Sequence, residues 1–284
     1  MNSEDYLVYF KTKNIETFKI IFDIIQKLKQ DTFIKFYRGT DTTPGGIEIK
    51  DMDTDSVIVF KLEILQTNLD EFYCAEPVYV IGLDFSILSK IIQIMSDSAE
   101  LCFSILKCED QKLYIKSYNN NHTQEMESSI NLSINDYIDY PTADINYVSS
   151  ILINTDLFHT ACKKHSKISH YITIISTQTC LELQSKDTDT TRATLKTTFY
   201  TSINSSAKNN IIIRYDEKFL QENQIPIIEA DYSIANIAHF DKLRTPASQL
   251  DIRIAAGHEP IALIYDIPKF GRFTAFIAAI QTDD

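Results

Sequence analysis

The sequence has 284 residues, of which 44% are apolar and 23% are charged. This composition is typical of a soluble globular protein with room for two domains of ordinary size. The net charge of −12 argues at first against a nucleic-acid partner, and the six glycines form neither a G-x-G-x-x-G nor a G-x-x-x-x-G-K-[ST] phosphate loop.

The reactive side chains form no pattern that is typical of a catalytic or metal site. The five cysteines contain no C-x-x-C pair and mostly lie in apolar stretches, which favours buried free thiols in a reducing compartment. The six histidines include no H-E-x-x-H, and no G-x-S-x-G is present. We therefore expect no catalytic residue, no metal ion and no cofactor.

The N-terminal stretch MNSEDYLVYF lacks the basic region and apolar core of a secretion signal. No apolar run approaches the ~20 residues of a membrane span. We expect a cytosolic or nuclear protein that does not contact membranes.

The first half of the chain is predicted to contain two short helices. Residues Asn14 to Lys29 place their large apolar side chains on one stripe, with Asn14 as the N-cap. Residues Asp84 to Met95 begin on a capping aspartate and repeat apolar residues at helical spacing. Short segments that alternate apolar and polar residues surround both helices and are predicted to be strands.

Between these helices, the stretch D-M-D-T-D-S spaces Asp51, Asp53 and Asp55 two residues apart, as a calcium-binding loop does. Such a loop needs Gly at its sixth position and Glu at its twelfth, whereas this chain has Ser56 and Leu62 there. The flanking residues alternate as strands do, so the pattern predicts a tight turn. An α+β enzyme that uses the three acids with magnesium is the alternative.

The second half of the chain repeats the order of elements in the first. Helices are predicted at Thr155 to Lys167 and at Ser233 to Arg244, again among alternating segments. The two halves are joined by INDYIDYPTADI, residues 134–145, which is acidic, contains a proline and shows little periodicity. We therefore predict two similar α+β domains, 1–133 and 146–284, joined by a connecting loop over 134–145.

Charge is distributed unevenly between the predicted helices and the rest of the chain. The first and fourth helices each have a net charge of +1, the second has +1 over residues 85–95, and the third has +2, so the remaining residues carry −17. Basic helices that share one surface could face phosphates in spite of the acidic total. Alternatively, these lysines only solvate exposed helix faces.

Three stretches resemble the proliferating cell nuclear antigen family of DNA sliding clamps. GIEIKDMDTDSVIVFKLEI with EFYCAEPVYVIGLDFSILSKIIQIM is similar to the family's "MD-x-x-x-V" turn, "Y-x-C" strand and second helix. INDYIDYP resembles the interdomain connector, and EPIALIYDIPKFGRFTAFIAAI resembles the C-terminal hairpin. The resemblance implies a homotrimeric ring in which the two similar clamp domains of each chain pack two short helices each on antiparallel sheets.

The resemblance also implies that the basic helices line a central hole and contact double-stranded DNA without reading its sequence. The residues predicted to contact DNA are Lys19, Lys27, Lys90, Lys163, Lys164, Lys167, Lys242 and Arg244. Ile20 and Gln93 stand where the family often has lysine.

The family holds client proteins, among them DNA polymerase and repair proteins, by a Q-x-x-aliphatic-x-x-aromatic-aromatic motif. The matched stretches place this peptide pocket at Met52, Val57, Val59, Ile138, Tyr140, Pro141, Pro260, Phe276, Ala278 and Ala279. These residues could also be ordinary core residues. The chain departs from the family at Ser56, Phe276 and Ala279, where histidine, tyrosine and proline are usual, so client preference is expected to differ.

Ring closure in the family pairs a strand of one subunit with a strand of the next, which here corresponds to Thr123 to Leu132 and Thr191 to Tyr200. The resemblance further implies a clamp loader as a partner and action in the nucleus or at a viral replication site. Within the same fold, a subunit of a heteromeric checkpoint clamp or a clamp-derived viral transcription factor is an alternative.

Overall fold

The computed structural model describes residues 5–96, 100–119, 123–133, 137–140, 145–186, 193–201, 211–222, 227–257 and 259–280. They fall into two compact units. The first consists of Met1–Thr54, Phe60–Tyr140 and Ile267–Phe273, and the second of Asp55–Val59, Pro141–Asp266 and Thr274–Asp284. Each unit consists mainly of antiparallel strands with few helices, which confirms the predicted α+β class.

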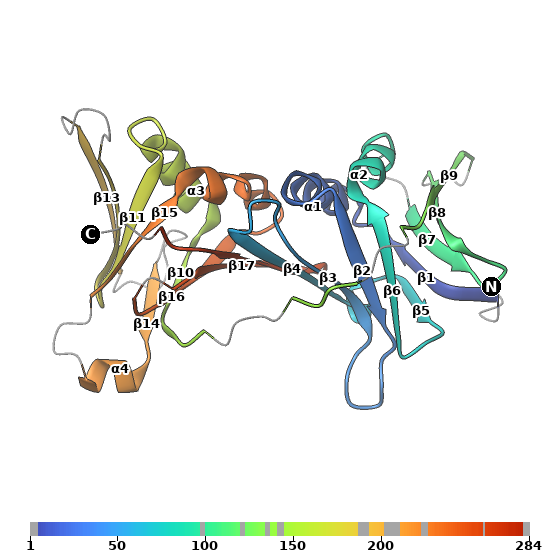
Figure 1. Ribbon diagram of the computed structural model, residues 1–284, viewed down its shortest axis with the longest axis horizontal. Helices are drawn as coiled ribbons and strands as arrows, with labels where there is room; N and C mark the ends of the chain where they lie inside the picture. The colour runs from blue at the N-terminus through green and yellow to red at the C-terminus, as the bar shows by residue number, and fades with distance from the viewer. Residues whose placement is uncertain are drawn as a thin grey trace. The chain divides into compact units, whose positions relative to one another are not determined.

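Two sheets and two helices make up the first unit (Figure 1). Its strands are β1 (Tyr6–Thr12), β2 (Asp31–Tyr37), β3 (Gly46–Met52), β4 (Ile58–Leu65), β5 (Glu71–Cys74), β6 (Val78–Asp84), β7 (Glu100–Leu106), β8 (Glu109–Tyr118) and β9 (Glu125–Asn131). One sheet has the order β5-β1-β7-β8-β9, and the other strands follow the order β4-β3-β2-β6. The helices α1 (Ile15–Leu28) and α2 (Phe85–Gln93) pack against each other, and the 3₁₀ turn η2 (Gln66–Asn68) precedes β5.

The second unit is built in the same way. Its strands are β10 (Tyr147–Asn154), β11 (Tyr171–Ser176), β12 (Cys180–Lys186), β13 (Thr194–Tyr200), β14 (Ile212–Tyr215), β15 (Ile228–Ser233), β16 (Gln249–Ala255), β17 (Ile261–Ile267) and β18 (Gly271–Ile277). Their orders are β14-β10-β16-β17-β18 and β13-β12-β11-β15. Helix α3 (Thr155–His165) contacts α5 (Ile234–Ala238) and the 3₁₀ turn η3 (Asp241–Arg244), and α4 (Glu217–Glu222) follows β14.

The strand orders of the two units correspond one to one. Strands β1 to β9 and strands β10 to β18 occupy equivalent places in their sheets, in the same sequence order. Helices α1 and α3 follow the first strand of each set, and α2 and α5 follow β6 and β15. Among the described α-helices, α4 has no counterpart, because β5 and β6 are joined by a short turn. The same topology therefore occurs twice.

Aromatic rings attach α1 to the sheet beneath it. The Phe10 ring in β1 stacks on Phe103 in β7 with centroids 4.5 Å apart, and Phe18 of α1 lies 6.2 Å from both rings. Phe22, one turn later, lies 5.1 Å from Phe18. All four rings are buried, and burial of each contributes about 1.5–3 kcal/mol. The predicted apolar stripe therefore fixes which face of α1 is left for solvent.

Capping side chains begin the helices, although not always the predicted ones. Asp84 accepts hydrogen bonds from two main-chain N–H groups in the first turn of α2, at 2.7 and 3.3 Å, as predicted. Helix α3 is capped by Asn154 at 3.1 Å, while the buried hydroxyl of Thr155 makes no hydrogen bond among the described residues. Asn14 stands at the N-cap of α1 but does not cap it, because its side chain donates to the carbonyl of Lys269 at 3.1 Å instead.

The fourth predicted helix, Ser233 to Arg244, is not continuous. Ser233 accepts from the N–H of Asn236 at 3.5 Å, but α5 ends at Ala238 and η3 begins at Asp241. Between them, Phe240 is fully buried, and its carbonyl accepts from the N–H of Leu243 at 2.9 Å. This tighter turn aligns residues three apart, so both Phe240 and Leu243 reach the core.

The sequence interpretation missed α4 and the short strand β5. In α4 only Phe219 and Leu220 are apolar, which is too few for a stripe, but Asp216 accepts from the N–H of Phe219 at 3.1 Å and caps the helix. The rings of Phe219 and Tyr215 also stack with centroids 6.1 Å apart.

No helix among the described residues has the length and apolar character needed to cross a bilayer.

The predicted turn over residues 51–56 is present between β3 and β4, and its acidic side chains differ in burial. Asp51 is buried and accepts hydrogen bonds from the Thr32 hydroxyl and from the N–H of Met52, whereas Asp55 is exposed. Ser56 has a φ of 60°, a left-handed conformation that turns the chain. In the part of the chain that the structure describes, no three His, Cys, Asp or Glu side chains gather as metal ligands.

Candidate functional site

The first unit carries three of the predicted DNA-contacting lysines on its two helices, and two of them bind within the chain. The ammonium of Lys19 donates to the carbonyl of Met95, just after α2, at 2.5 Å. Lys27 lies 2.8 Å from the carboxylate of Asp23, one turn earlier on α1. Lys90 on α2 is exposed, and no carboxylate among the described residues lies within ion-pair distance of it. The Asp23 carboxylate therefore offsets the charge of Lys27, whereas Lys19 keeps its charge but is held by a main-chain carbonyl.

Of the two positions where the family often has lysine, Gln93 serves the contact between α1 and α2. The Gln93 side-chain amide donates to the main-chain carbonyl of Lys19 at 3.1 Å. Ile20 is half-buried. Gln93 thus makes a neutral hydrogen bond at a position where a lysine would add a second positive charge to α2, next to that of Lys90.

The second unit presents its lysines differently. Lys163 and Lys164 lie in the last turn of α3, and Lys167 follows in the turn after it. All three are exposed, and no carboxylate among the described residues pairs with them. The helix dipole favours cations in the last turn of a helix, where Lys163 and Lys164 lie.

The remaining predicted cations lie on η3, which packs against α3. Arg244 pairs with Asp156 in the first turn of α3 at 3.4 Å and with Asp241 at 3.8 Å. Lys242 on the same turn is exposed. The structure therefore places Lys163 and Lys164 in the last turn of α3 and Lys167 in the turn that follows, while Arg244 is partly neutralised.

Two buried histidines hold the inner face of α3 and contribute no charge to it. His159 Nε2 lies 2.9 Å from the hydroxyl of Tyr265, and burial lowers the pKa of His159 to about 4. His165 Nδ1 lies 2.9 Å from Ser185 Oγ and its Nε2 lies 3.0 Å from Thr197 Oγ1, and burial lowers its pKa as well. Both rings are neutral at neutral pH, so the positive charge of α3 comes from its lysines.

In the first unit, the predicted peptide-pocket residues are Met52, Ile138 and Tyr140. The ammonium of Lys50 in β3 lies 3.3 Å from the carboxylate of Asp139. This ion pair attaches residues 137–140 to β3, two residues from Met52. Ile138 is 57% exposed, a large fraction for an isoleucine, while Met52 and Tyr140 are half-buried. Ile138 is thus the most accessible apolar side chain of this group.

The second unit holds the other members of the predicted pocket. The Ala278 N–H donates to the carbonyl of Val57 at 2.9 Å, and the N–H of Ile280 donates to Asp231 of β15 at 2.8 Å. The carbonyl of Glu259, next to Pro260, accepts from Tyr232 of β15 at 3.3 Å, so both segments lie beside this strand. The half-buried members are Val57, Val59, Pro260, Phe276, Ala278 and Ala279.

One member of the predicted pocket, Pro141, lies outside the described residues. The predicted connecting loop over 134–145 is described only at residues 137–140 and 145. The pocket as a whole therefore stays a prediction.

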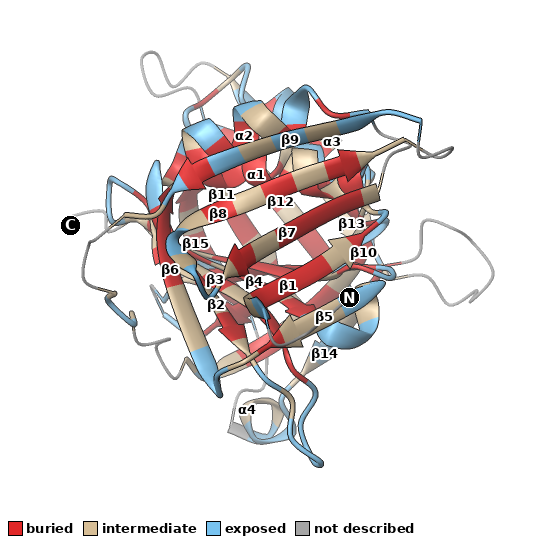
Figure 2. Ribbon diagram, turned by 90° about the vertical axis from the view of Figure 1, so that its right-hand side faces the viewer, coloured by how far each residue is buried: buried red, intermediate tan, exposed pale blue. Residues whose placement is uncertain are grey.

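The strands predicted to close a ring, β9 and β13, each end the order of their sheet. β9 spans Glu125–Asn131 and β13 spans Thr194–Tyr200, slightly shorter than predicted, and residues 191 and 192 lie outside the described part. Figure 2 shows β9 as largely exposed or intermediate, whereas β1 and β7 of the same sheet are mainly buried. Each edge therefore has main-chain groups that pair with no other strand among the described residues.

Sequence reasoning missed the carboxylates that neutralise part of the helix surface. The Asp23–Lys27 pair has a spacing of four residues and could have been read from the sequence. Asp156 and Arg244 are 88 residues apart, and only the packing of η3 against α3 brings them together.

Comparisons with known proteins identify relatives of the chain. Residues 9–140 match the family model described as "Proliferating cell nuclear antigen, N-terminal domain". A "Probable DNA polymerase sliding clamp" of Acanthamoeba polyphaga mimivirus is 24% identical over 241 residues, which are 84% of this chain and 48% of that protein. A "Probable DNA polymerase sliding clamp 1" of Paramecium bursaria Chlorella virus 1 is 21% identical over 281 residues, 99% of both chains. The chain thus spans about half of the mimivirus relative and nearly all of the chlorella virus relative.

Proposed function

We propose that this chain, whose residues 9–140 form an N-terminal domain of the proliferating cell nuclear antigen family, is a DNA sliding clamp that keeps a DNA polymerase on its template. The observation that carries the proposal is a set of three exposed lysines at and just after the end of α3, Lys163, Lys164 and Lys167, which pair with no carboxylate among the described residues although the chain has a net charge of −12. The printed names of the two viral relatives support the same role.

The lysines would act on the phosphate backbone rather than on bases. Flexible ammonium groups on a helix face meet phosphates of any sequence and release condensed counter-ions, so binding is independent of sequence and falls steeply with salt. A few such contacts hold DNA loosely, which permits sliding. Persistence on DNA would then come from encirclement.

A ring is suggested by the equivalence of strands in the two units. In the equivalent places of the sheets, β18 corresponds to β9 and β4 corresponds to β13. Within the first unit, Gly271 at the start of β18 lies so close to Glu63 of β4 that a Cβ on Gly271 would be 2.1 Å from the carbonyl oxygen of Glu63. By the same geometry, β9 of one copy would pair with β13 of the next, head to tail. Three copies per ring follow from the family resemblance.

Clients would bind at the apolar residues around the connector and the C-terminal hairpin. Ile138 in the first unit and Phe276 in the second would contact the aromatic residues of a Q-x-x-aliphatic-x-x-aromatic-aromatic motif. Ser56, Phe276 and Ala279 would set a client preference different from that of other members. The chain would act as a tether for polymerase and repair proteins without catalysis of its own.

Loading onto DNA would need a clamp loader, and the site of action would be the nucleus or a viral replication site. The family resemblance implies both, and the viral source of the two relatives supports action at a site of viral replication.

Assembly is tested by size-exclusion chromatography with light scattering on the purified chain. The expected mass is three times 32.6 kDa. A strict monomer at micromolar concentration would contradict the ring and favour a heteromeric clamp subunit or a monomeric factor.

The client surface is tested by fluorescence polarisation with a synthetic peptide that carries the motif. Ile138→Ala and Phe276→Ala should each abolish binding without changing the mass, because each removes an apolar contact but no strand edge. Ile212→Ala, at an exposed isoleucine of β14, is the matched control. Unchanged affinity in both site variants would refute the pocket.

A further inference from the structure

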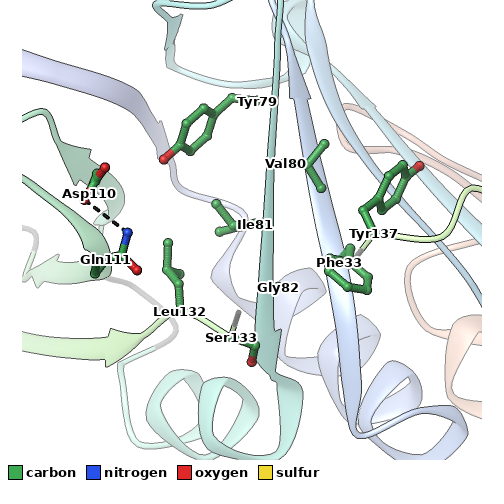
Figure 3. A pocket seen from close by; sticks show the side chains of 10 residues that line it. All are labelled: Phe33, Tyr79, Val80, Ile81, Gly82, Asp110, Gln111, Leu132, Ser133 and Tyr137. Atoms are coloured by element: carbon green, nitrogen blue, oxygen red, sulfur yellow. Dashed lines mark hydrogen bonds between the residues drawn. The ribbon is translucent and has the colours of Figure 1, made fainter. Parts of the chain in front are cut away.

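A hollow of about 290 Å³ lies at the outer edge of β6 in the first unit (Figure 3). Its walls include Tyr79 and Val80 of β6, Asp110 of β8, and the rings of Phe33 and Tyr137. It shares no residue with the helix surface or with the predicted client pocket. Its volume is near the lower end of the range for small binding sites, so it suits one or two side chains of a larger partner.

The main chain along this edge has hydrogen-bonding groups that no described residue satisfies. β6 ends its sheet order and pairs on one side with β2. The Arg38 N–H donates to the carbonyl of Pro77 at 3.1 Å, toward β2. Because antiparallel pairing alternates, Val78 and Val80 direct their N–H and C=O groups away from β2. Each offers one donor and one acceptor there.

The same edge already accepts one strand-like contact from the chain itself. The Ser133 N–H donates to the outward carbonyl of Gly82 at 2.7 Å, and the two residues form an isolated antiparallel bridge. This contact shows that the edge is geometrically able to take a strand partner. It also limits a further partner to the length of β6 that begins at Val78 and ends before Gly82.

Side chains on the two faces of β6 would contact alternate residues of such a partner. In Figure 3, Val80 lies on the same side as Phe33 and Tyr137, whose rings meet edge to face with centroids 5.4 Å apart. Tyr79 lies on the other side, with Asp110 beyond it. One face is therefore apolar and aromatic, and the other combines a tyrosine with a carboxylate.

The Asp110 carboxylate has no cation to balance it. Its hydrogen-bond partner is the Gln111 amide at 3.2 Å, and no Lys, Arg or His among the described residues lies within ion-pair distance. The pKa of Tyr79 is raised by burial and, next, by the negative charge of Asp110, which places the two groups within electrostatic reach. A Lys or Arg side chain over the Tyr79 ring would gain both the carboxylate and the aromatic face.

We propose that an extended segment of a partner protein adds to β6 as a strand at Val78 and Val80, with a basic residue toward Tyr79 and Asp110 and apolar neighbours toward Phe33 and Tyr137. The main chain provides affinity, and the alternation of one basic residue between two apolar ones provides selectivity. This docking edge does not depend on the DNA-binding or client-pocket proposals.

The probe is an acetylated and amidated hexapeptide, Thr-Val-Arg-Val-Thr-Val, compared with the same peptide carrying Glu in place of Arg. Binding to the full-length, isotope-labelled chain is followed by nuclear magnetic resonance. We expect the amide signals of Val78 and Val80 to shift with the Arg peptide, and the Glu peptide to bind about tenfold more weakly.

Two variants test separately the contribution of the Asp110 charge and that of the main-chain hydrogen bonds. Asp110→Asn should weaken the Arg peptide about tenfold and remove its advantage over the Glu peptide. Val80→Pro should abolish binding, because proline removes an N–H that points away from β2 and leaves the bonds to β2 in place. Asp41→Asn, at an exposed acid in the β2–β3 loop, is the control and should bind as the unmodified chain does.

Equal binding of the two peptides, or unchanged affinity in both variants, would overturn the proposal. So would shifts of Val78 and Val80 that depend on protein concentration without peptide, since these would assign the edge to a second copy of the chain. If the light-scattering mass is that of a monomer while the Arg peptide still binds β6, only the clamp function fails.

Discussion

The helix surfaces of the two units share one topology and differ in what their cations bind. In the first unit, Lys19 donates to a carbonyl and Lys27 pairs with Asp23 on its own helix. In the second, Lys163 and Lys164 end α3 without a carboxylate partner among the described residues. Equivalent secondary structure therefore does not give equivalent electrostatics. We infer that the second unit supplies most of the attraction for phosphates.

The inner faces of the same helices differ as well. Helix α1 is anchored by phenylalanine rings, whereas α3 is anchored by the neutral histidines His159 and His165. Of the two, the second arrangement includes imidazoles, whose pKa lies near neutral pH in an unfolded chain and is lowered by burial in the fold. The comparison thus predicts different responses to charge and to pH in the two units.

The largest expected effect is on the stability of the second unit in mild acid. Burial lowers the His159 pKa from 6.5 to about 4, so the unfolded chain takes up a proton that the folded chain excludes. The stabilising contribution is complete above pH 6.5 and is lost as the pH falls from 6.5 to about 4. The full loss is roughly 3 kcal/mol, and roughly 2 kcal/mol of it falls between pH 7 and pH 5.

Hydrogen exchange at pH 7 and pH 5, corrected for the intrinsic exchange rate, measures this effect separately in the two helices. Protection of α3 should fall more than protection of α1. His159→Gln, which keeps a hydrogen-bonding group near Tyr265, should reduce the pH dependence. Equal loss of protection in α1 and α3 would show that His159 is not its source.

The second prediction tests the lysines. Charge reversal in Lys163→Glu with Lys164→Glu should weaken binding to duplex DNA about tenfold or more, because it removes two cations and adds two anions near the phosphates. The slope of log affinity against log salt should fall by about 0.9 for each lysine that contacts a phosphate. Fluorescence anisotropy over a salt series measures both quantities.

The matched variant in the first unit is Lys19→Glu with Lys27→Glu, which removes the same charge from cations that already have partners. Its loss of DNA affinity should be smaller, and the mass of the assembly should be unchanged in both variants. An equal loss in the two variants would remove the distinction between the units.

A smaller effect is expected when a cation is added to the first unit. Gln93→Lys would place a second ammonium near Lys90 and should raise DNA affinity about threefold at low salt, with the gain falling as salt is added. Gln93→Met is the neutral control that also loses the hydrogen bond to the Lys19 carbonyl. If the methionine variant gains as much affinity, charge is not the cause.

The smallest effect concerns the pair within α1. Asp23→Asn would free Lys27 and should raise DNA affinity less than about twofold, while lowering the free energy of unfolding by about 0.3–0.5 kcal/mol through loss of the i,i+4 pair. Anisotropy and urea titration measure the two changes. Asp70→Asn, at an exposed acid outside the helices, should change neither.

Much of the fold could be predicted because local chemistry and burial agree along the chain. The stripe from Ile15 to Leu28 predicted α1 within one residue at each end, and Asp84 predicted the start of α2. Alternation also placed the turn after β3, where the acids had suggested a metal loop. In each case the pattern needed only neighbours within a few residues.

The misses occur where a distant contact outweighs the local signal. The Asn14 side chain does not cap α1, because it donates a hydrogen bond to the carbonyl of Lys269 instead. The helix predicted from Ser233 to Arg244 is interrupted after Ala238, where the Phe240 side chain is buried in the core. Helix α4 was missed because two apolar residues form no stripe, although the Asp216 cap could have indicated its start.

The sequence by itself determined the composition of the two helix surfaces, because lysine spacing and apolar stripes are local and repeat in order. It also determined the α+β class, since periodicity distinguishes strands from helices without tertiary contacts. Only the tertiary structure decided which cations remain free, because ion pairs such as Asp156–Arg244 join residues far apart in the chain. The docking edge of β6 likewise depends on strand order, which decides which main-chain groups are left unpaired.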